Sequence, residues 1–171
     1  MPPAAERRLF WLTAGTVLLL DAVTKVIAEA SLLRGAGVPV IGDWFQLRLV
    51  YNQGAAFGLH LGPFSRWIFL AVAAAAVVFL ARMSATGPAG DRVRQLALGL
   101  VAGGAAGNLV DRVKSGRGVV DFFDVGIGDL RWPTFNVADV AVTCGAVALA
   151  LVLWREDAQR AAESSASAPA P

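Results

Sequence analysis

The chain has 171 residues, of which 56% are hydrophobic and only 16% are charged, whereas roughly a quarter are charged in an ordinary soluble domain. This composition argues against a free soluble enzyme and predicts one membrane domain that exposes apolar surface to lipid. The formal net charge of +2, without any run of Lys or Arg, excludes a nucleic-acid partner. One cysteine, Cys144, and one histidine, His60, are too few for a disulfide or for a metal cluster built on these residue types.

Four apolar segments predict four transmembrane helices, at about residues 9–30, 65–82, 94–112 and 135–154. The uninterrupted apolar runs are shorter than the about 20 residues that cross a bilayer, so each span has to include isolated polar residues. The first segment follows two arginines and also has features of a cleavable secretory signal. Three charges between Asp21 and Ala30 favour an uncleaved first span instead.

The segments outside the predicted spans differ in character. Residues of about 35–62 are expected to form a β-rich region, because residues 44–51 alternate apolar and polar side chains as a half-exposed strand does. Residues 114–133 are expected to be a Gly-rich connection. The tail at 156–171 is rich in Ala, Ser and Pro and is predicted to be disordered, which leaves a single domain over residues 1–155.

Four spans place both termini on the same side of the membrane. The arginines and lysines that flank the spans are equally numerous on the two sides, so their number does not decide the orientation. Arg7 and Arg8 directly precede the first span. This pair favours cytoplasmic termini.

Two patterns inside the spans point to helix packing. Asp21 and Lys25 are four residues apart, so on a helix they share a face and neutralise each other. A structural ion pair is the favoured interpretation, and a proton path or a counter-ion for a substrate is the alternative. Gly99, Gly103 and Gly107 recur every four residues and predict a face for close helix contact.

Asp121 and Asp139 are the strongest candidates for chemistry, because both carboxylates have apolar neighbours. If the last helix starts near residue 135, Asn136 lies one turn from Asp139 on the same side. Two adjacent carboxylates share a proton and activate a water, as in an aspartic protease. The alternative is that Asp121 caps a turn while Asp139 forms an ion pair with Arg112 or Lys25. Spacing alone does not decide between them.

Three further polar residues are weaker candidates. Asn108 and Arg112 share one face at the end of the third span, either as an interfacial anchor or as a clamp for a substrate carbonyl or head group. Asn52 ends the strand-like region, beside a glycine at residue 54 that predicts a tight turn.

The order of these segments resembles the bacterial signal peptidase II family, the lipoprotein signal peptidases. The resemblance is carried by five motifs in family order: DAVTK at 21–25, NQGAAF at 52–57, GGAAGNLVDR at 103–112, VVDF at 119–122 and FNVAD at 135–139. It covers most of the chain. It implies an all-α polytopic membrane protein, with four transmembrane helices and a small periplasmic β-rich cradle.

The resemblance also implies an activity. Members are aspartic endopeptidases that remove the signal peptide from diacylglyceryl-modified prolipoproteins, N-terminal to the lipidated lipobox cysteine, and they require no metal or cofactor. It implies a multi-pass protein of the bacterial cytoplasmic (inner) membrane, with cytoplasmic termini, an active site near the periplasmic face and a substrate that arrives from the lipid. We expect a monomer. By motif position, the catalytic residues are Asp121 and Asp139, the substrate-binding residues are Asn52, Asn108, Arg112 and Asn136, and the residues that support the fold are Asp21, Lys25 and Gly54.

Two functions from other classes are the alternatives. A small transporter or channel subunit would use the intramembrane charges as a proton or ion relay. That relay would consist of Asp21, Lys25, Arg112, Asp121 and Asp139. A structural membrane scaffold would use the same charges only as ion pairs between helices. The wholly apolar inner half of the last span disfavours a relay.

Overall fold

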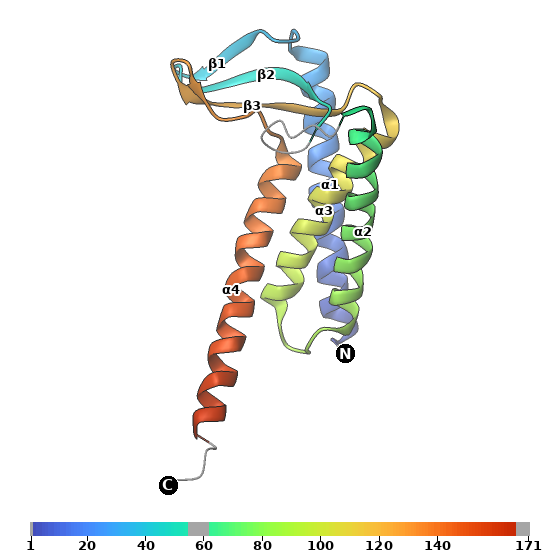
Figure 1. Ribbon diagram of the computed structural model, residues 1–171, viewed down its shortest axis with the longest axis vertical. Coiled ribbons are helices and arrows are strands. Elements are labelled where there is room, and N and C mark those ends of the chain that lie inside the picture. Colours follow the sequence, from blue (N-terminus) through green and yellow to red (C-terminus); the bar gives the residue numbers. More distant parts are fainter. Residues whose placement is uncertain (1, 55–61, 167–171) are drawn as a thin grey trace.

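The computed structural model describes residues 2–54 and 62–166, which form a helical bundle with a small sheet at one end (Figure 1). The helices are α1 (Ala4–Ser31), α2 (Ser65–Thr86), α3 (Arg92–Lys114) and α4 (Val137–Ala166). A short 3-10 helix, η2 (Gly62–Phe64), leads into α2. All four long helices are apolar enough to cross a membrane, which confirms the four predicted spans.

The last helix is longer than predicted. Disorder was expected from residue 156 onward, but α4 continues to Ala166, so that prediction is wrong for 156–166. Ala, Glu and Arg in this stretch are good helix formers, and Glu156 forms an ion pair with Arg94 of α3. The remaining tail residues, 167–171, lie outside the described residues.

Helix α3 is the centre of the bundle and packs against α1, α2 and α4. Its glycines allow this close approach. A Cβ on Gly103 would lie 2.7 Å from the carbonyl oxygen of Ala14 in α1, and a Cβ on Gly104 would lie 2.8 Å from Val142 Cγ2 in α4. Small residues let helix backbones approach in lipid, where no hydrophobic effect drives the helices together.

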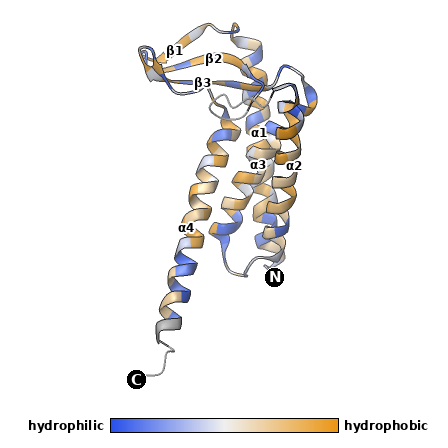
Figure 2. Cartoon of the chain, in the orientation of Figure 1, coloured by the Kyte–Doolittle hydropathy of each residue, from blue (hydrophilic) through white to orange (hydrophobic). Residues whose placement is uncertain are grey.

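Hydrophobic residues predominate along the middle of the helices (Figure 2). Large side chains such as Trp11, Leu19 and Phe79 are more than 60% exposed, as expected for residues that face lipid rather than water. The polar groups lie inside. Gln95 is fully buried and its side-chain oxygen accepts a hydrogen bond from Ser84 Oγ at 2.6 Å.

Four strands form an antiparallel sheet in the order β1-β2-β3-β4. They are β1 (Gly37–Ile41), β2 (Phe45–Asn52), β3 (Val119–Ile127) and β4 (Leu130–Arg131). The predicted β-rich region thus supplies two strands, and its residues 55–61, which include His60, lie outside the described residues.

The sheet also contains a strand from a segment expected to be a loop. Residues 114–133 were predicted to be a Gly-rich connection, but β3 occupies the middle of this segment and pairs with β2. The strand is stabilised by burial, because Val119, Val120 and Phe122 are all less than 10% exposed. Its glycines lie at or beyond the ends of the buried stretch, which is why composition alone suggested a loop.

The sheet lies where α1 and α3 end and where α4 begins (Figure 1). A buried carboxylate, Asp124 in β3, binds Arg48 of β2 at 2.9 Å and Arg131 of β4 at 2.6 Å. These two ion pairs hold three neighbouring strands together. The first residues of α1 and the last residues of α4 lie at the opposite end of the bundle (Figure 1).

Candidate active site

The N-terminus of α4 positions Asp139. Asn136 precedes the helix, and its side-chain Oδ1 accepts a hydrogen bond from the backbone N of Asp139 at 2.9 Å. In return, the backbone N of Asn136 donates to Asp139 Oδ2 at 3.1 Å. This reciprocal pair is a capping box, which satisfies two of the N–H groups that a helix start leaves unpaired. It fixes the Asp139 carboxylate at the end of α4 nearest the sheet.

Strand β3 positions Asp121 opposite Val50 of β2. Asn136 Nδ2 donates to Asp121 Oδ1 at 2.7 Å, and Asn52 Nδ2 donates to Asp121 Oδ2 at 3.1 Å. Asn136 therefore contacts both carboxylates, through its side chain and its backbone. Two aspartates that are 18 residues apart in the sequence share one site because of this asparagine.

The two carboxylates have different surroundings. Asp121 is only 1% exposed, and this burial raises its pKa to about 7, with the charge of Asp139 acting in the same direction. Asp139 is half-buried, and its Oδ1 accepts a hydrogen bond from Asn108 Nδ2 at 2.8 Å. Below about pH 7, the Asp121 carboxyl thus holds a proton.

The end of α3 forms the third side of the site. Arg112 donates through one terminal nitrogen to the carbonyl of Asn108 at 3.1 Å and through the other to the carbonyl of Gly54 at 2.9 Å. The guanidinium also lies over the ring of Phe69, 5.7 Å from its centroid. Arg112 therefore ties the chain after β2 to the helix that carries Asn108.

These side chains open into a cavity of about 860 Å³. The polar lining includes Asn52, Gln53, Asn108, Arg112, Asp121 and Asp139, and the remaining lining includes Trp132, Phe135, Val140, Val142, Thr143 and Cys144. The cavity thus has a polar end at the two carboxylates and a more apolar wall along α4. A neutral acid beside a carboxylate can activate a water and hydrogen-bond a carbonyl oxygen.

The geometry tests the structural interpretation that spacing left open, whereas the catalytic interpretation stays a prediction. Asp121 lies within β3 and does not cap a turn. Among the described residues, no ion pair joins Asp139 to Arg112 or Lys25. The structural alternative for this pair of aspartates is therefore wrong in both parts. All six residues expected at the active site by resemblance lie on this one cavity or, for Asn136, between its carboxylates.

The three residues expected to support the fold are buried nearby. Lys25 is 3% exposed and lies 2.7 Å from Asp21 Oδ2, so the ion pair predicted from their spacing is present. Gly54 is buried, and its backbone N donates to Asn52 Oδ1 at 3.0 Å. Lys25 also binds a residue that the sequence analysis did not single out, Asp111, at 2.7 Å. The signal for Asp111 was its position three residues after Asn108, on the same helix face.

Residues that could hold a metal are not grouped here. Within residues 2–54 and 62–166, no three His, Cys, Asp or Glu side chains form a metal-binding cluster. Cys144 is exposed on the cavity wall of α4.

Comparisons with known proteins agree with this geometry. Residues 13–155 match the family described as Signal peptidase (SPase) II. The chain is 42% identical to the lipoprotein signal peptidase of Rhodococcus jostii over 161 residues, covering 88% of this chain and 75% of the relative. It is 41% identical to the lipoprotein signal peptidase of Desulfitobacterium hafniense over 152 residues, covering 87% of this chain and 95% of the relative.

A solved structure described as a bacterial membrane enzyme has a TM-score of 0.78 and 29% identity to this chain, covering 86% of this chain and 88% of the other. A second such structure has a TM-score of 0.73 and 30% identity, covering 83% and 90%. The fold, the paired aspartates and the match over residues 13–155 lead to the same conclusion: this chain belongs to the signal peptidase II family, a family of proteases.

Proposed function

We propose that the protein is an aspartic endopeptidase that removes the signal peptide from diacylglyceryl-modified prolipoproteins, N-terminal to the lipidated cysteine. Its curated relatives carry the name lipoprotein signal peptidase, which supports this substrate class. The observation that carries the proposal is the position of Asn136, which donates to both Asp121 and Asp139.

In the proposed mechanism, the Asp139 carboxylate takes a proton from a water bound between the two acids. That water attacks the carbonyl carbon that precedes the lipidated cysteine. When the C–N bond then breaks, the proton on Asp139 passes to the leaving amine of the cysteine. The neutral Asp121 carboxyl hydrogen-bonds the carbonyl oxygen and stabilises the negative charge that develops there. The raised pKa of Asp121 supports this division of roles, because an acid can donate only while it is protonated.

Substrate binding follows from the lining of the cavity. Asn52, Asn108 and Arg112 supply directional hydrogen bonds for a peptide backbone, and Asn136 orders the acids. The apolar wall along α4, which includes Val140 and Val142, suits the diacylglyceryl chains. We therefore infer that the lipidated substrate reaches the cavity sideways from the bilayer, while the peptide bond stays at the polar end.

The location of the acids at the sheet end of the bundle sets the proposed orientation (Figure 1). Prolipoproteins are processed where the signal peptide leaves the membrane, so the sheet end faces the periplasm and both termini face the cytoplasm. The proposed location is the bacterial inner membrane. The chain is proposed to act as a monomer, because all the active-site groups come from a single copy.

The test is cleavage by the purified protein in detergent. A diacylglyceryl-modified prolipoprotein and its unlipidated form are incubated with the wild type and with Asp139→Asn, and product masses are measured. We expect cleavage directly before the cysteine in the lipidated substrate only, and none with the variant. Well-folded wild-type protein that leaves both substrates intact would overturn the proposal.

A further inference from the structure

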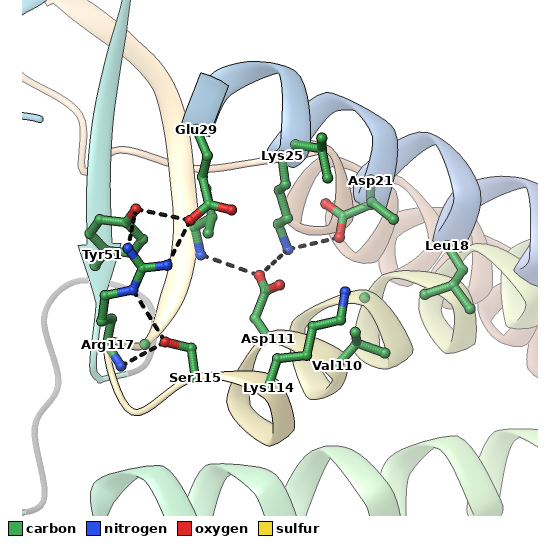
Figure 3. Close-up of a pocket in the computed structure, with 15 residues that line it drawn as sticks. Leu18, Asp21, Lys25, Glu29, Tyr51, Val110, Asp111, Lys114, Ser115 and Arg117 are labelled. Carbon is green, nitrogen blue, oxygen red and sulfur yellow. Dashed lines mark hydrogen bonds and ion pairs between the residues drawn. The ribbon is translucent and has the colours of Figure 1, made fainter. Parts of the chain in front are cut away.

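A buried ammonium group lies next to the active site but outside its cavity. Figure 3 shows Lys25 of α1 reaching towards α3, with its Nζ 2.7 Å from Asp21 Oδ2 and 2.7 Å from Asp111 Oδ2. A third contact, not drawn there, runs from Lys25 Nζ to Asn108 Oδ1 at 3.1 Å. The three N–H bonds of the ammonium thus have three acceptors.

Each of the two acids that bind Lys25 also holds the backbone next to a catalytic aspartate. Asp21 Oδ1 accepts a hydrogen bond from the backbone N of Ala138, the residue before Asp139, at 2.9 Å. Asp111 Oδ2 accepts one from the backbone N of Val120, the residue before Asp121, at 3.2 Å. Lys25 therefore stabilises the charges of Asp21 and Asp111, the two acids that hold the backbone directly before Asp139 and Asp121.

The third contact fixes the direction of an amide. An ammonium group only donates hydrogen bonds, so Asn108 has to present its oxygen to Lys25. The same oxygen accepts from Asn136 Nδ2 at 3.1 Å. The Asn108 nitrogen is consequently directed to Asp139, to which it donates at 2.8 Å. Without Lys25, the Asn108 oxygen would lose one of these two donors, and the amide would be held less firmly in this direction.

We infer that Lys25 is a positioning residue for the proteolytic reaction, which sets the separation and the hydrogen bonding of Asp121 and Asp139 through Asp21, Asp111 and Asn108. The inference rests on the proposed function and adds to it. It goes beyond support of the fold, because the contact through Asn108 leads to Asp139 and the other two lead to the residues directly before Asp121 and Asp139. Lys25 itself does not line the catalytic cavity.

Glu29 of α1 provides a matched control for Lys25. Both residues line a second cavity, of about 240 Å³. Glu29 binds Arg117 at 3.1 Å and accepts a hydrogen bond from Tyr51 at 2.9 Å (Figure 3). Glu29 is one turn beyond Lys25 on α1, and it contacts Arg117 and Tyr51 rather than the three partners of Lys25. Glu29→Gln thus removes a neighbouring ion pair without altering the three contacts of Lys25.

Four variants separate positioning from folding. Lys25→Met removes the donor, and Asp111→Leu removes the acceptor for Val120. Lys25 and the backbone N of Val120 both donate to Asp111 Oδ2. Asp111→Asn can keep its amide oxygen at this position, so it retains one acceptor for both donors. We expect Lys25→Met and Asp111→Leu to lower kcat about 100-fold with KM little changed, since small displacements of reacting groups have costs of that order. Asp111→Asn and Glu29→Gln should keep kcat within about threefold.

The pH dependence gives a readout that a purely structural role would not change. The charged groups around Asp121 are Asp139 of α4, Arg112 and Asp111 of α3, and Lys25 of α1. Lys25→Met removes a positive charge that lowers the pKa of Asp121, and so raises this pKa. We expect the titration of Asp121 to move up by about half a pH unit. Infrared measurement of the protonated carboxyl band, assigned by its loss in Asp121→Asn, follows this titration without turnover.

The outcomes are distinguishable. The inference is overturned if folded Lys25→Met retains wild-type kcat, if Asp111→Asn loses as much activity as Asp111→Leu, or if the Asp121 titration in Lys25→Met stays at the wild-type pH. The comparison of the two Asp111 variants applies even where Lys25→Met yields no folded protein. Failure of the wild type to cleave a lipidated substrate would overturn the proposed function instead, while the infrared titration would still test the coupling.

Discussion

Asn52, at the end of β2, donates its side-chain nitrogen to Asp121 Oδ2 at 3.1 Å, although the two residues are 69 positions apart in the chain. The amide is held in this direction because its oxygen accepts the backbone N–H of Gly54 at 3.0 Å. The turn after β2 and the buried carboxylate of β3 are therefore positioned together. Any change at Asn52 alters both the turn and the acid.

The rate should depend on pH through Asp121. Its carboxyl has to be protonated to hydrogen-bond the substrate carbonyl, and burial raises its pKa to about 7. Asp121 holds the proton below this pH and loses it above. We therefore expect kcat/KM to fall as the pH rises through about 7, measured with a lipidated substrate in detergent. A rate that stays constant from about pH 6 to pH 9 would contradict the role of Asp121 as the acid.

Asn52→Ala should move this pH dependence upward. The hydrogen bond from Asn52 favours the ionised form of Asp121, so its removal raises the pKa of that acid. We expect the fall in kcat/KM to occur at higher pH, with a lower maximal rate. Gln46, at the other end of β2, provides the control, because its side chain donates to Asp43 and Gln46→Ala should leave the profile unchanged. A profile displaced to lower pH in Asn52→Ala would count against this hydrogen bond.

Arg112→Lys should impair catalysis although the charge is retained. The two terminal nitrogens of Arg112 bind the carbonyls of Asn108 and Gly54, whereas a lysine has a single nitrogen and cannot span both. Loss of one charged hydrogen bond predicts a decrease in kcat/KM of about 10-fold or more. Arg92→Lys, at the far end of α3 on an exposed position, should have no effect. Equal activity of Arg112→Lys and wild type would show that one contact is sufficient.

Gly103→Ala should destabilise the bundle. Its Cβ would lie 2.7 Å from a backbone oxygen of α1, which cannot move without displacing the helix. We expect a loss of about 1 to 3 kcal/mol, seen as a lower midpoint of thermal unfolding in detergent. Gly15 on α1 has open space around it, so Gly15→Ala should be neutral or stabilising, because alanine is the better helix former. A midpoint for Gly103→Ala at or above the wild-type value would contradict the close packing of α1 and α3.

The sequence predicts the helical part of the fold well, because apolar spans and small-residue faces are local patterns. Strand β3 was missed since its stability comes from pairing with β2 and burial against the bundle, which no window of sequence contains. The helical residues 156–166 were missed for the opposite reason: their Ala and Ser content resembles that of a disordered tail.

For the active site, resemblance supplied the residues and spacing supplied one relationship, Asn136 beside Asp139. Spacing could not indicate that Asn136 also reaches Asp121, because that contact depends on how β3 enters the sheet. The contact between Lys25 and Asp111 joins α1 and α3. This contact could not be predicted from the sequence either, because Lys25 has Asp21 and Asp111 has Arg112 as a nearer partner of opposite charge.

The capping box of α4 forms between Asn136 and Asp139 within one helical turn, whereas the bond from Asn136 to Asp121 joins that turn to β3. The two carboxylates are therefore paired only where α4 and β3 are both in place. A chain in which either element is displaced has two separate carboxylates and no paired acid.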